Sequence, residues 1–250
     1  TRCSTRARAR ARVLHLVRPA KTVLELGASV GLMTAVMHSW DIEVTAVELD
    51  PTAHGILSEA AMRVLIGDLD DPHTLEPLGN ERFDVVLASD VLEHLKDPLR
   101  CLRQAAQHVK PEGRVIVSIP NIAHGDIRLA LLAGSFEYAD MGLLDRTHIK
   151  FFTRSSLTNF LAAAGLEPIK WHRTERPIGE SEISLPAELV AWGRRVLAED
   201  PDADTYQWLV ECKVSQVGAQ VPAVEPVDAH NPVVRALSGG FVARVKSRLR

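Results

Sequence analysis

Short apolar segments alternate with amphipathic segments along most of the chain. Two of the apolar segments are hydrophobic on both faces, VVLA at 85–88 and VIVSI at 115–119, as expected of strands that are covered on both sides. Strands that alternate with helices predict an α/β fold built on a parallel sheet. The predicted strands are 22–26, 43–48, 63–66, 83–88, 113–119, 167–173 and 206–214.

Apolar residues at helical spacing predict helices between the strands, and several of these helices have recognisable ends. Pro98 stands at the start of one of them, in the first-turn position that proline favours. Thr153 precedes another as its N-cap, and Gly165 follows its last turn, where glycine is common. The best-defined predicted helices are 98–109, 154–164 and one within 175–203.

Composition and charge narrow the class of protein. The chain has 250 residues, a net charge of −3 and 46% hydrophobic residues, enough for one sizeable domain and without a global field that favours nucleic acid or a membrane surface. No apolar run approaches the ~18 residues of a membrane span. Its three cysteines lack metal-ligand spacing and read as free thiols. We expect a cytoplasmic protein that binds neither nucleic acid nor a membrane.

Two stretches interrupt the alternation, and the end of the chain differs from the rest. We expect one domain over 1–214, with lid insertions at about 120–152 and 175–203. The segment 215–250 contains several prolines and ends in the basic FVARVKSRLR, which predicts a linker and a basic tail. A further biosynthetic domain, fused to this chain or associated with it, is left open by the tail.

The most informative motif is VLELGASVGLMT, at 23–34. It predicts a buried strand, a glycine turn from Gly27 to Gly31, and a helix whose first N–H groups point at a ligand. Glu25 places an acid two residues before the turn. A nucleotide pyrophosphate would be repelled by that acid, whereas a cation would be attracted. The acid therefore favours S-adenosyl-L-methionine, which carries a sulfonium and an ammonium group.

Acids also end the second and third predicted strands. Glu48 follows the glycine turn by about twenty residues, where a strand-end acid can accept both hydroxyls of an adenosine ribose; a solvated strand-end acid is the alternative. In GDLDD, Asp68 can accept the adenine amine while Leu69 offers its backbone and an apolar contact. We assign Asp71 to capping, because Pro72 starts a helical pattern.

The fourth predicted strand leads into FDVVLASDVLEHLKDP, at 83–98. Here the chain leaves the sheet at Ser89 and Asp90, beside the crevice where open α/β sheets bind ligands. Together with ELGASVG, VELD, GDLDD and PEGRVIVSIPN, this run resembles the class I S-adenosylmethionine-dependent methyltransferases over about residues 13–173. HGDIRLALLAGSFEYADMGLLDRTHIKFFT is similar to bacterial methyltransferases of sugar, glycan or secondary-metabolite biosynthesis, some of them fused to glycosyltransferases.

The resemblance implies a doubly wound, seven-stranded Rossmann-like sheet whose last strand is antiparallel, with S-adenosyl-L-homocysteine as the product of the cofactor. The family usually has a glycine where this chain has Ser29, so the geometry of the loop is a point to test. The cofactor residues that the resemblance implies are Glu25, Gly27, Ala28, Ser29, Gly31, Glu48, Leu49, Asp68, Leu69, Ser89 and His94.

The candidate catalytic residues lie mainly in Asp145-Arg146-Thr147-His148. Methylation of a hydroxyl needs a positioned base, and His148 is the first choice because imidazole titrates near neutral pH. Asp145 and Asp90 complete the predicted catalytic set, with Asp145 orienting His148 or binding a substrate hydroxyl. Arg146 can bind an anionic group of the substrate. The alternative is that this charged cluster only pins the lid through salt bridges.

The sequence also bears on metal binding and on the reaction that the protein catalyses. No tight ligand spacing such as HxxxH is present, so we expect no metal, although Asp90, Glu93, Asp145 and His148 form an alternative metal set. The predicted function is O-methylation of a sugar, glycan intermediate or natural-product hydroxyl, the acceptor being a small molecule or saccharide. N-methylation, a non-catalytic cofactor-binding scaffold and, least of all, a nicotinamide-dependent oxidoreductase are the alternatives.

Overall fold

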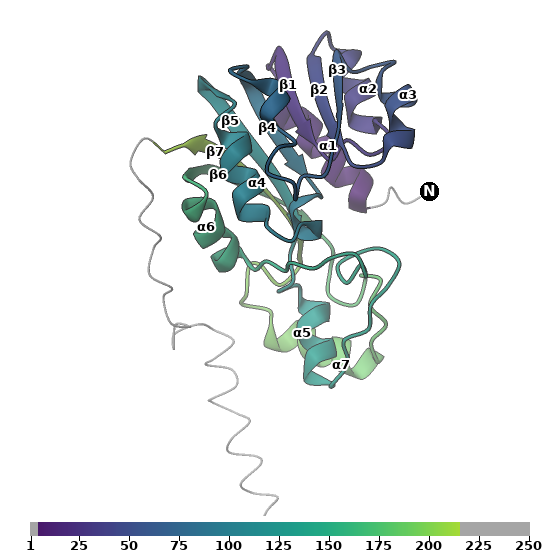
Figure 1. Cartoon of the computed structure of the whole chain (residues 1–250). Coiled ribbons are helices and arrows are strands. Elements are labelled where there is room, and N and C mark those ends of the chain that lie inside the picture. The colour runs from purple at the N-terminus through teal and green to yellow at the C-terminus, as the bar shows by residue number, and fades with distance from the viewer. Residues whose placement is uncertain (1–4, 216–250) are drawn as a thin grey trace, which may run out of the picture.

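The structure, a computed structural model, describes residues 5–215 and places seven strands in one sheet (Figure 1). The strand order is β3-β2-β1-β4-β5-β7-β6. The first five strands are parallel to their neighbours, whereas β7 runs antiparallel to both β5 and β6. The predicted seven-stranded sheet with a reversed last strand is therefore confirmed. The strands are β1 (Thr22–Leu26), β2 (Glu43–Glu48), β3 (Arg63–Ile66), β4 (Phe83–Ser89), β5 (Val109–Pro120), β6 (Leu166–Glu175) and β7 (Thr205–Val214).

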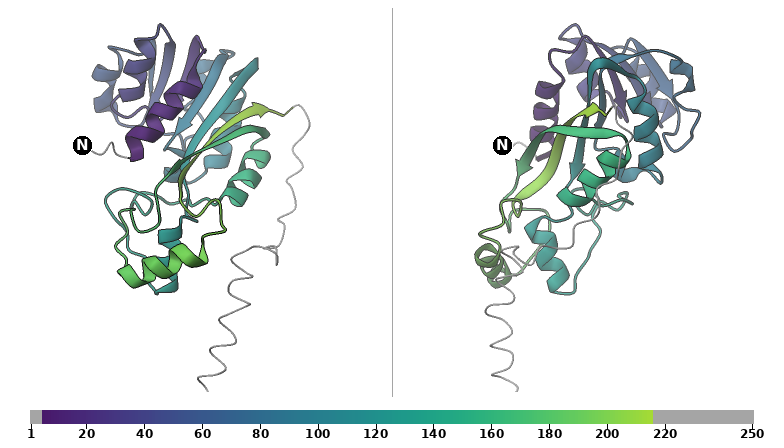
Figure 2. Two further views of the ribbon diagram at one scale, coloured as in Figure 1. Left: turned by 180° about the vertical axis from the view of Figure 1, so that it is seen from behind. Right: turned by 90° about the vertical axis from the view of Figure 1, so that its left-hand side faces the viewer.

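Helices cover both faces of this sheet, as Figures 1 and 2 show. Side chains alternate along a strand, so β4 sends Val85 and Leu87 to a core shared with α1 and α2, and Val86 and Ala88 to a core shared with α4 and α6. Burial on both faces explains why β4 reads as a continuous apolar run. The helices are α1 (Thr5–Val17), α2 (Leu32–His38), α3 (His54–Leu57), α4 (Pro98–Ala106), α5 (Gly125–Leu132), α6 (Arg154–Ala163) and α7 (Ala187–Val196), with 3-10 turns η1 (Pro51–Ala53), η2 (Glu76–Leu78) and η3 (Leu92–His94).

The ends of α6 follow the local signals in the sequence. The Thr153 side chain accepts a hydrogen bond from the Ser156 N–H while the Ser156 hydroxyl reaches back to the Thr153 backbone, which is a reciprocal capping box. Gly165 adopts φ +77° just past the helix, a conformation that favours glycine. The predicted N-cap and the predicted stop are both confirmed.

The segment between β3 and β4 does not form the helix that Pro72 suggested, and the assignment of Asp71 as its cap was wrong. The Asp71 side chain instead accepts from the His73 N–H at 2.9 Å and closes a turn. A helix from Pro72 would need the N–H of residue 77 to bond the carbonyl of His73, and Pro77 has no N–H. The chain therefore crosses this gap with turns and η2.

An amino-terminal helix, α1, is present that was not among the predicted helices. α1 buries Ala9, Val13 and Val17, whose exposed fractions are 1%, 0% and 0%. These residues are spaced four apart, so they form one stripe along the helix. The alternating RARARAR pattern hides this stripe, because every second position carries a charge that reads as solvent-exposed.

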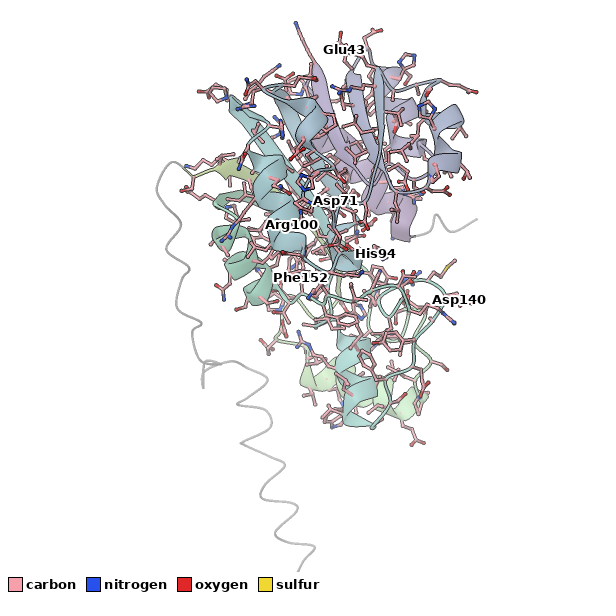
Figure 3. All side chains as sticks on the ribbon, in the orientation of Figure 1. Glu43, Asp71, His94, Arg100, Asp140 and Phe152 are labelled. Carbon is pink, nitrogen blue, oxygen red and sulfur yellow. The ribbon has the colours of Figure 1, made fainter. Side chains whose placement is uncertain are left out.

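The two insertions form a small helical lobe, defined here as residues 120–152 and 175–203, next to the carboxyl end of β5 (Figure 1). Its own apolar clusters join α5 to α7 and to the loop at 143–144. The buried Asp126 carboxylate accepts from the N–H groups of Gly179 and Ser181, so the two insertions are hydrogen-bonded to each other. In Figure 3, His94 lies where the sheet meets this lobe.

The structure bears on two of the expectations from composition, the state of the cysteines and the absence of a membrane span, within residues 5–215. Cys101 and Cys212 are free and buried, and burial raises the pKa of both thiols to about 12, which makes them inert. Cys3 and the tail over 216–250 lie outside the described residues. Among residues 5–215, the structure has no helix that combines the length and apolarity of a membrane span.

Candidate functional site

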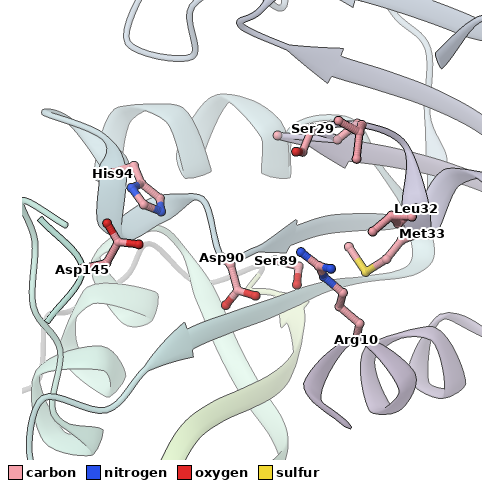
Figure 4. A pocket seen from close by; sticks show the side chains of 11 residues that line it. Arg10, Ser29, Leu32, Met33, Ser89, Asp90, His94 and Asp145 are labelled. Carbon is pink, nitrogen blue, oxygen red and sulfur yellow. The ribbon is translucent and has the colours of Figure 1, made fainter. Parts of the chain in front are cut away.

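A pocket of about 240 Å³ opens at the carboxyl ends of β1 and β4, close to the lobe (Figure 4). This is the edge of the sheet at which the sequence placed the site. Its lining joins the glycine turn, the end of β4, η3, one lobe residue and, from α1, an arginine. The lining residues are Arg10, Gly27, Ala28, Ser29, Val30, Leu32, Met33, Ser89, Asp90, His94 and Asp145.

The glycine turn has the backbone geometry that its sequence predicts. Gly27 and Gly31 have φ +71° and +73°, and a Cβ on Gly27 would lie 2.7 Å from a methyl carbon of Val91. Both positions therefore need glycine, for backbone freedom and, at Gly27, for space. Ser29 also adopts a left-handed φ of +52°, a conformation that glycine adopts more readily, so this chain places a serine in a less favourable region.

Glu48 fixes the turn from the neighbouring strand. One of its carboxylate oxygens accepts from the Ser29 N–H at 2.6 Å, and the other accepts from the Asp50 N–H at 3.0 Å. These charge-assisted bonds hold the carboxylate at the end of β2 and offset the unfavourable backbone of Ser29. Leu49 follows with its side chain 63% exposed. The predicted ribose role of Glu48 stays a prediction, with a carboxylate already oriented for it.

Glu25 lies behind the turn rather than in the pocket. Its side chain is 1% exposed, and the Thr34 hydroxyl donates to its Oε2 at 2.6 Å. Burial raises the pKa of Glu25 to about 7, against the lowering effect of the Thr34 bond. The opposite Oε1 is buried without a hydrogen-bond partner. The cofactor role of Glu25 stays a prediction: from this position it could act on a ligand only through its charge and through α2, and a nearby cation would favour its ionised form.

The end of β3 lies beside Glu48 without reaching the pocket lining. The Gly67 N–H donates to the Glu48 carbonyl at 2.9 Å. Asp68 and Leu69, which follow Gly67 in the sequence, therefore begin close to the end of β2. Asp68 accepts from the Asp70 N–H at 2.8 Å, and Leu69 is buried. The adenine roles of Asp68 and Leu69 stay predictions. Of the predicted cofactor residues, those outside the lining are Glu25, Gly31, Glu48, Leu49, Asp68 and Leu69.

The end of β4 contributes Ser89 and a strained Asp90. Asp90 adopts φ +54°, which is uncommon for a residue other than glycine and typical of functional sites. The Gln207 side-chain amide of β7 donates to both the Asp90 carboxylate and the Ser118 hydroxyl. The antiparallel strand thus holds this carboxylate at the pocket wall.

His94 is the histidine that borders the pocket, whereas His148 does not. The Nδ1–H of His94 donates to the Thr147 carbonyl at 3.1 Å, which leaves Nε2 as the basic nitrogen. His148 is only 3% exposed, and its Nδ1 lies 3.3 Å from the Leu143 carbonyl. Its ring stacks edge-on against His94, with centroids 4.8 Å apart. The geometry therefore favours His94 over His148 for contact with an acceptor.

The two charged neighbours of His148 have different environments. Asp145 lines the pocket and accepts from the Thr147 N–H and hydroxyl at 2.9 and 2.6 Å. Its predicted roles, orienting His148 or binding a substrate hydroxyl, stay predictions. Arg146 pairs with Asp140 at 2.6 Å on the exposed side of the lobe. That pair fits the salt-bridge alternative for Arg146 better than substrate binding.

Arg10 is a pocket residue that the sequence analysis missed. It comes from α1 and lies near Ser89 and Asp90 in Figure 4. Its position next to the buried Ala9 of the apolar stripe is the only signal in the sequence, and that signal appears once α1 is recognised. A guanidinium at this place can bind a carboxylate through two parallel hydrogen bonds.

Glu93, His94 and His148 form a group that could hold a metal ion. Their ligand atoms lie within 4.8 Å of one another, and the Glu93 Oε1 to His148 Nε2 distance is 4.0 Å. Zinc ligands stand at about 2.0–2.2 Å from the ion, so these side chains would have to draw closer to bind one. The group shares only Glu93 and His148 with the alternative metal set of the sequence analysis.

Comparison with known proteins agrees with this geometry. A family model described as "Methyltransferase domain" matches residues 3–170. The ubiquinone biosynthesis O-methyltransferase of Azorhizobium caulinodans is 34% identical over 161 residues, which cover 60% of this chain and 61% of that protein. The chain thus matches about three fifths of the length of this curated relative. It belongs to the methyltransferase-domain family, and S-adenosylmethionine is its cofactor.

Solved structures show the same fold at low sequence identity. The Burkholderia thailandensis 1,6-didemethyltoxoflavin-N1-methyltransferase, crystallised with its acceptor and S-adenosylhomocysteine, superposes with a TM-score of 0.53 at 21% identity, covering 86% of this chain and 80% of that one. An Archaeoglobus fulgidus SAM-dependent methyltransferase gives a TM-score of 0.59 at 16% identity, covering 83% and 94%. The Rossmann-like methyltransferase fold is therefore established for this chain.

The residues present fit the cofactor. The backbone at Gly27 leaves no room for a side chain beside Val91, so the turn approaches its surroundings closely, as a loop that cradles a ligand does. Arg10 can pair with the methionine carboxylate, while the Asp90 carboxylate can attract the ammonium and sulfonium groups. The exposed Leu49 beside Glu48 offers an apolar surface to an adenine.

Proposed function

We propose that this protein transfers the methyl group of S-adenosylmethionine to a hydroxyl of a small-molecule acceptor, with His94 as the base. The observation that carries the proposal is the position of His94, which lines the pocket while its Nδ1–H is held by the Thr147 carbonyl. A hydroxyl attacks a methyl carbon well only as its proton leaves. An imidazole that lines the pocket and is held through its Nδ1–H, with Nε2 left without a hydrogen, can supply that function.

The residues of the chain position the two reactants. S-adenosylmethionine, when bound, supplies a methyl group activated by its sulfonium. Arg10 would hold its carboxylate and Glu48 its ribose, so that the methyl group faces the end of β4. His94 would take the hydroxyl proton at Nε2, and Asp145 would bind a neighbouring polar group of the acceptor. Alignment of the two reactants supplies most of the rate enhancement.

The class of acceptor is the finer part of the proposal. A sugar, glycan intermediate or natural-product hydroxyl remains our candidate, on the resemblance of the segment 124–153 to methyltransferases of that kind. The lobe carries exposed aromatic side chains at Phe136 and Tyr138, which can stack on a ring of the acceptor. The Azorhizobium relative is named an O-methyltransferase, which supports oxygen as the methylated atom.

N-methylation is the second candidate function, and the Burkholderia structural neighbour is named an N1-methyltransferase. A neutral amine can attack the methyl group without a base, so N-methylation would leave His94 without a catalytic task. A scaffold that binds cofactor without transferring methyl groups is the third. Methyl transfer to any acceptor would exclude the scaffold.

The proposal is tested with methyl-labelled S-adenosylmethionine and a panel of saccharides, nucleotide sugars, phenols and amines. Mass spectrometry identifies products that are heavier by one CH₂ group, and fragmentation locates the methyl group. We expect label on oxygen in the presence of a hydroxylated acceptor. Label found only on nitrogen would make the second candidate correct, and cofactor binding with no labelled product across fractionated extracts would favour the scaffold.

A further inference from the structure

A second concave site lies on the far side of α1 from the cofactor pocket. Helix α1 crosses the back of the sheet (Figure 2) and, with β6 and β7, borders a groove of about 500 Å³. This volume is within the range of small-molecule sites, about 300–1,000 Å³. Its charged and titratable lining residues are Arg12, His15, Arg18, Lys170, His172 and Glu211.

Positive charge dominates this groove. Arg12 and Arg18 come from α1 and the loop after it, and Lys170 stands on the opposite wall in β6. Among residues 5–215, Glu211 is the only acid of the lining, and it is already engaged, because His172 lies 2.9 Å from its Oε1 and Arg114 lies 3.5 Å from its Oε2. The positive charge of the lining therefore has little compensating charge.

The walls of the groove are held in place before any ligand arrives. Arg114 donates to the carbonyls of Leu16, Val17 and Arg18 at 2.7, 3.3 and 3.0 Å, which fixes the end of α1 to the sheet. Arg12 donates to the Arg173 carbonyl of β6, so the two walls are joined. The Arg18 guanidinium rests on the Trp40 ring, 4.8 Å from its centroid. Fixed cations lose little conformational entropy on binding.

We propose that this groove binds the diphosphate group of a small molecule. The Arg12 guanidinium on α1 and the Lys170 ammonium on β6 line opposite walls of the groove, and this pair suits adjacent phosphates, since arginine binds phosphate oxygens in pairs and lysine adds a point charge. Ala11 and Leu16 also line the groove and offer an apolar surface to the rest of the ligand. A nucleoside diphosphate and an alkyl diphosphate share this chemistry.

The groove and the cofactor pocket use opposite sides of one helix. Arg10 lines the pocket and Arg12 lines the groove, and two positions along an α-helix are about 200° apart around its axis. The diphosphate site is therefore separate from the cofactor site, and the proposal does not rest on the proposed methyl transfer.

The test is isothermal titration of inorganic pyrophosphate into the full chain saturated with S-adenosylhomocysteine. The variant is Arg12→Gln/Lys170→Gln, and its matched control is Arg8→Gln/Lys150→Gln, which removes the same charges from exposed residues of α1 and the lobe. We expect pyrophosphate binding to weaken at least tenfold in the variant and to stay within twofold in the control, with unchanged S-adenosylhomocysteine affinity in both. If loss of Arg12 disturbs α1, Lys170→Gln alone, at an exposed position, should still weaken pyrophosphate binding.

Three results would overturn the proposal. The first is no heat of binding with millimolar pyrophosphate, and the second is equal weakening in variant and control. The third is pyrophosphate binding that appears only when S-adenosylhomocysteine is left out, which would place pyrophosphate in the cofactor pocket. Uridine diphosphate and isopentenyl diphosphate distinguish the two sources of the group, and tighter binding of either one supports the site. Binding of an oligonucleotide alone would make the groove a nucleic-acid surface and contradict the proposal.

Discussion

The Nδ1–H of His94 donates to the Thr147 carbonyl at 3.1 Å and so joins the loop after β4 to the helical lobe. This bond decides which ring nitrogen is basic, because the nitrogen that donates to a carbonyl carries the hydrogen. It also makes the candidate base dependent on the lobe being in place. One hydrogen bond thus holds together the candidate base, His94, and the lobe that we expect to contact the acceptor.

Glu48 should control cofactor affinity. Glu48→Gln replaces one carboxylate oxygen by an amide group, so it removes an acceptor for the ribose and weakens the bond that holds the Ser29 N–H. We expect S-adenosylhomocysteine to bind at least tenfold more weakly, or about 1.4 kcal/mol, measured by isothermal titration. Glu43→Gln, at the exposed start of the same strand, is the control. Equal affinity in both variants would remove the ribose role.

Arg10 should recognise the carboxylate of the methionine part. Arg10→Gln is expected to weaken S-adenosylhomocysteine binding by about 1.5–3 kcal/mol, the usual range for a hydrogen bond to a charged group. Binding of 5′-methylthioadenosine, which lacks the carboxylate, should change little in the same variant. A similar loss for both ligands would mean that Arg10 acts on the fold of α1 rather than on the carboxylate. Arg8→Gln on the same helix serves as the control.

Glu25 should make stability depend on pH. Its pKa is raised from 4.5 to about 7 by burial, so the folded protein binds a proton that the unfolded chain has released between these values. Stability is therefore lost as pH rises from about 4.5 to about 7. Thermal unfolding across this range should show that the stability of Glu25→Gln increases relative to that of the wild type as pH rises. A constant difference between the two proteins at all pH values would contradict the raised pKa.

Removal of metal ions tests whether His94 acts as a base or as a metal ligand. The ligand atoms of Glu93, His94 and His148 lie within 4.8 Å of one another, wider than a compact zinc site, so we expect methyl transfer to be unchanged by EDTA. The measurement is the labelled-methyl assay with EDTA and then with added Mg²⁺, Mn²⁺ or Zn²⁺. Loss of activity that one of these ions restores would show that the three side chains close on a cation.

Local patterns were sufficient to predict the sheet and the ends of several helices. The central strand β4 is buried on both faces, and the Thr153 cap and Gly165 stop act within a few residues, so both leave a direct trace in the sequence. The helix expected after Pro72 failed through an equally local cause, the missing N–H of Pro77. The α1 helix was hidden because its apolar stripe is interleaved with arginines.

The positions of the candidate catalytic residues depend on contacts between segments that are distant in the sequence. Sequence patterns carry less information about such positions. Asp145 and His148 are three residues apart, yet only Asp145 reaches the pocket, because the turn directs His148 toward Glu93. Arg10 enters the pocket only because α1 packs across the sheet. Such placements follow from tertiary packing, which residue spacing does not encode.

The most direct test of this account is transfer of labelled methyl from S-adenosylmethionine to a hydroxylated acceptor by the wild type, His94→Gln and the exposed control His73→Gln. The account predicts that all three bind S-adenosylhomocysteine equally, that the wild type and His73→Gln transfer label to oxygen at the same rate, and that His94→Gln is slower by about 10²-fold or more. Transfer at the wild-type rate by His94→Gln would contradict it.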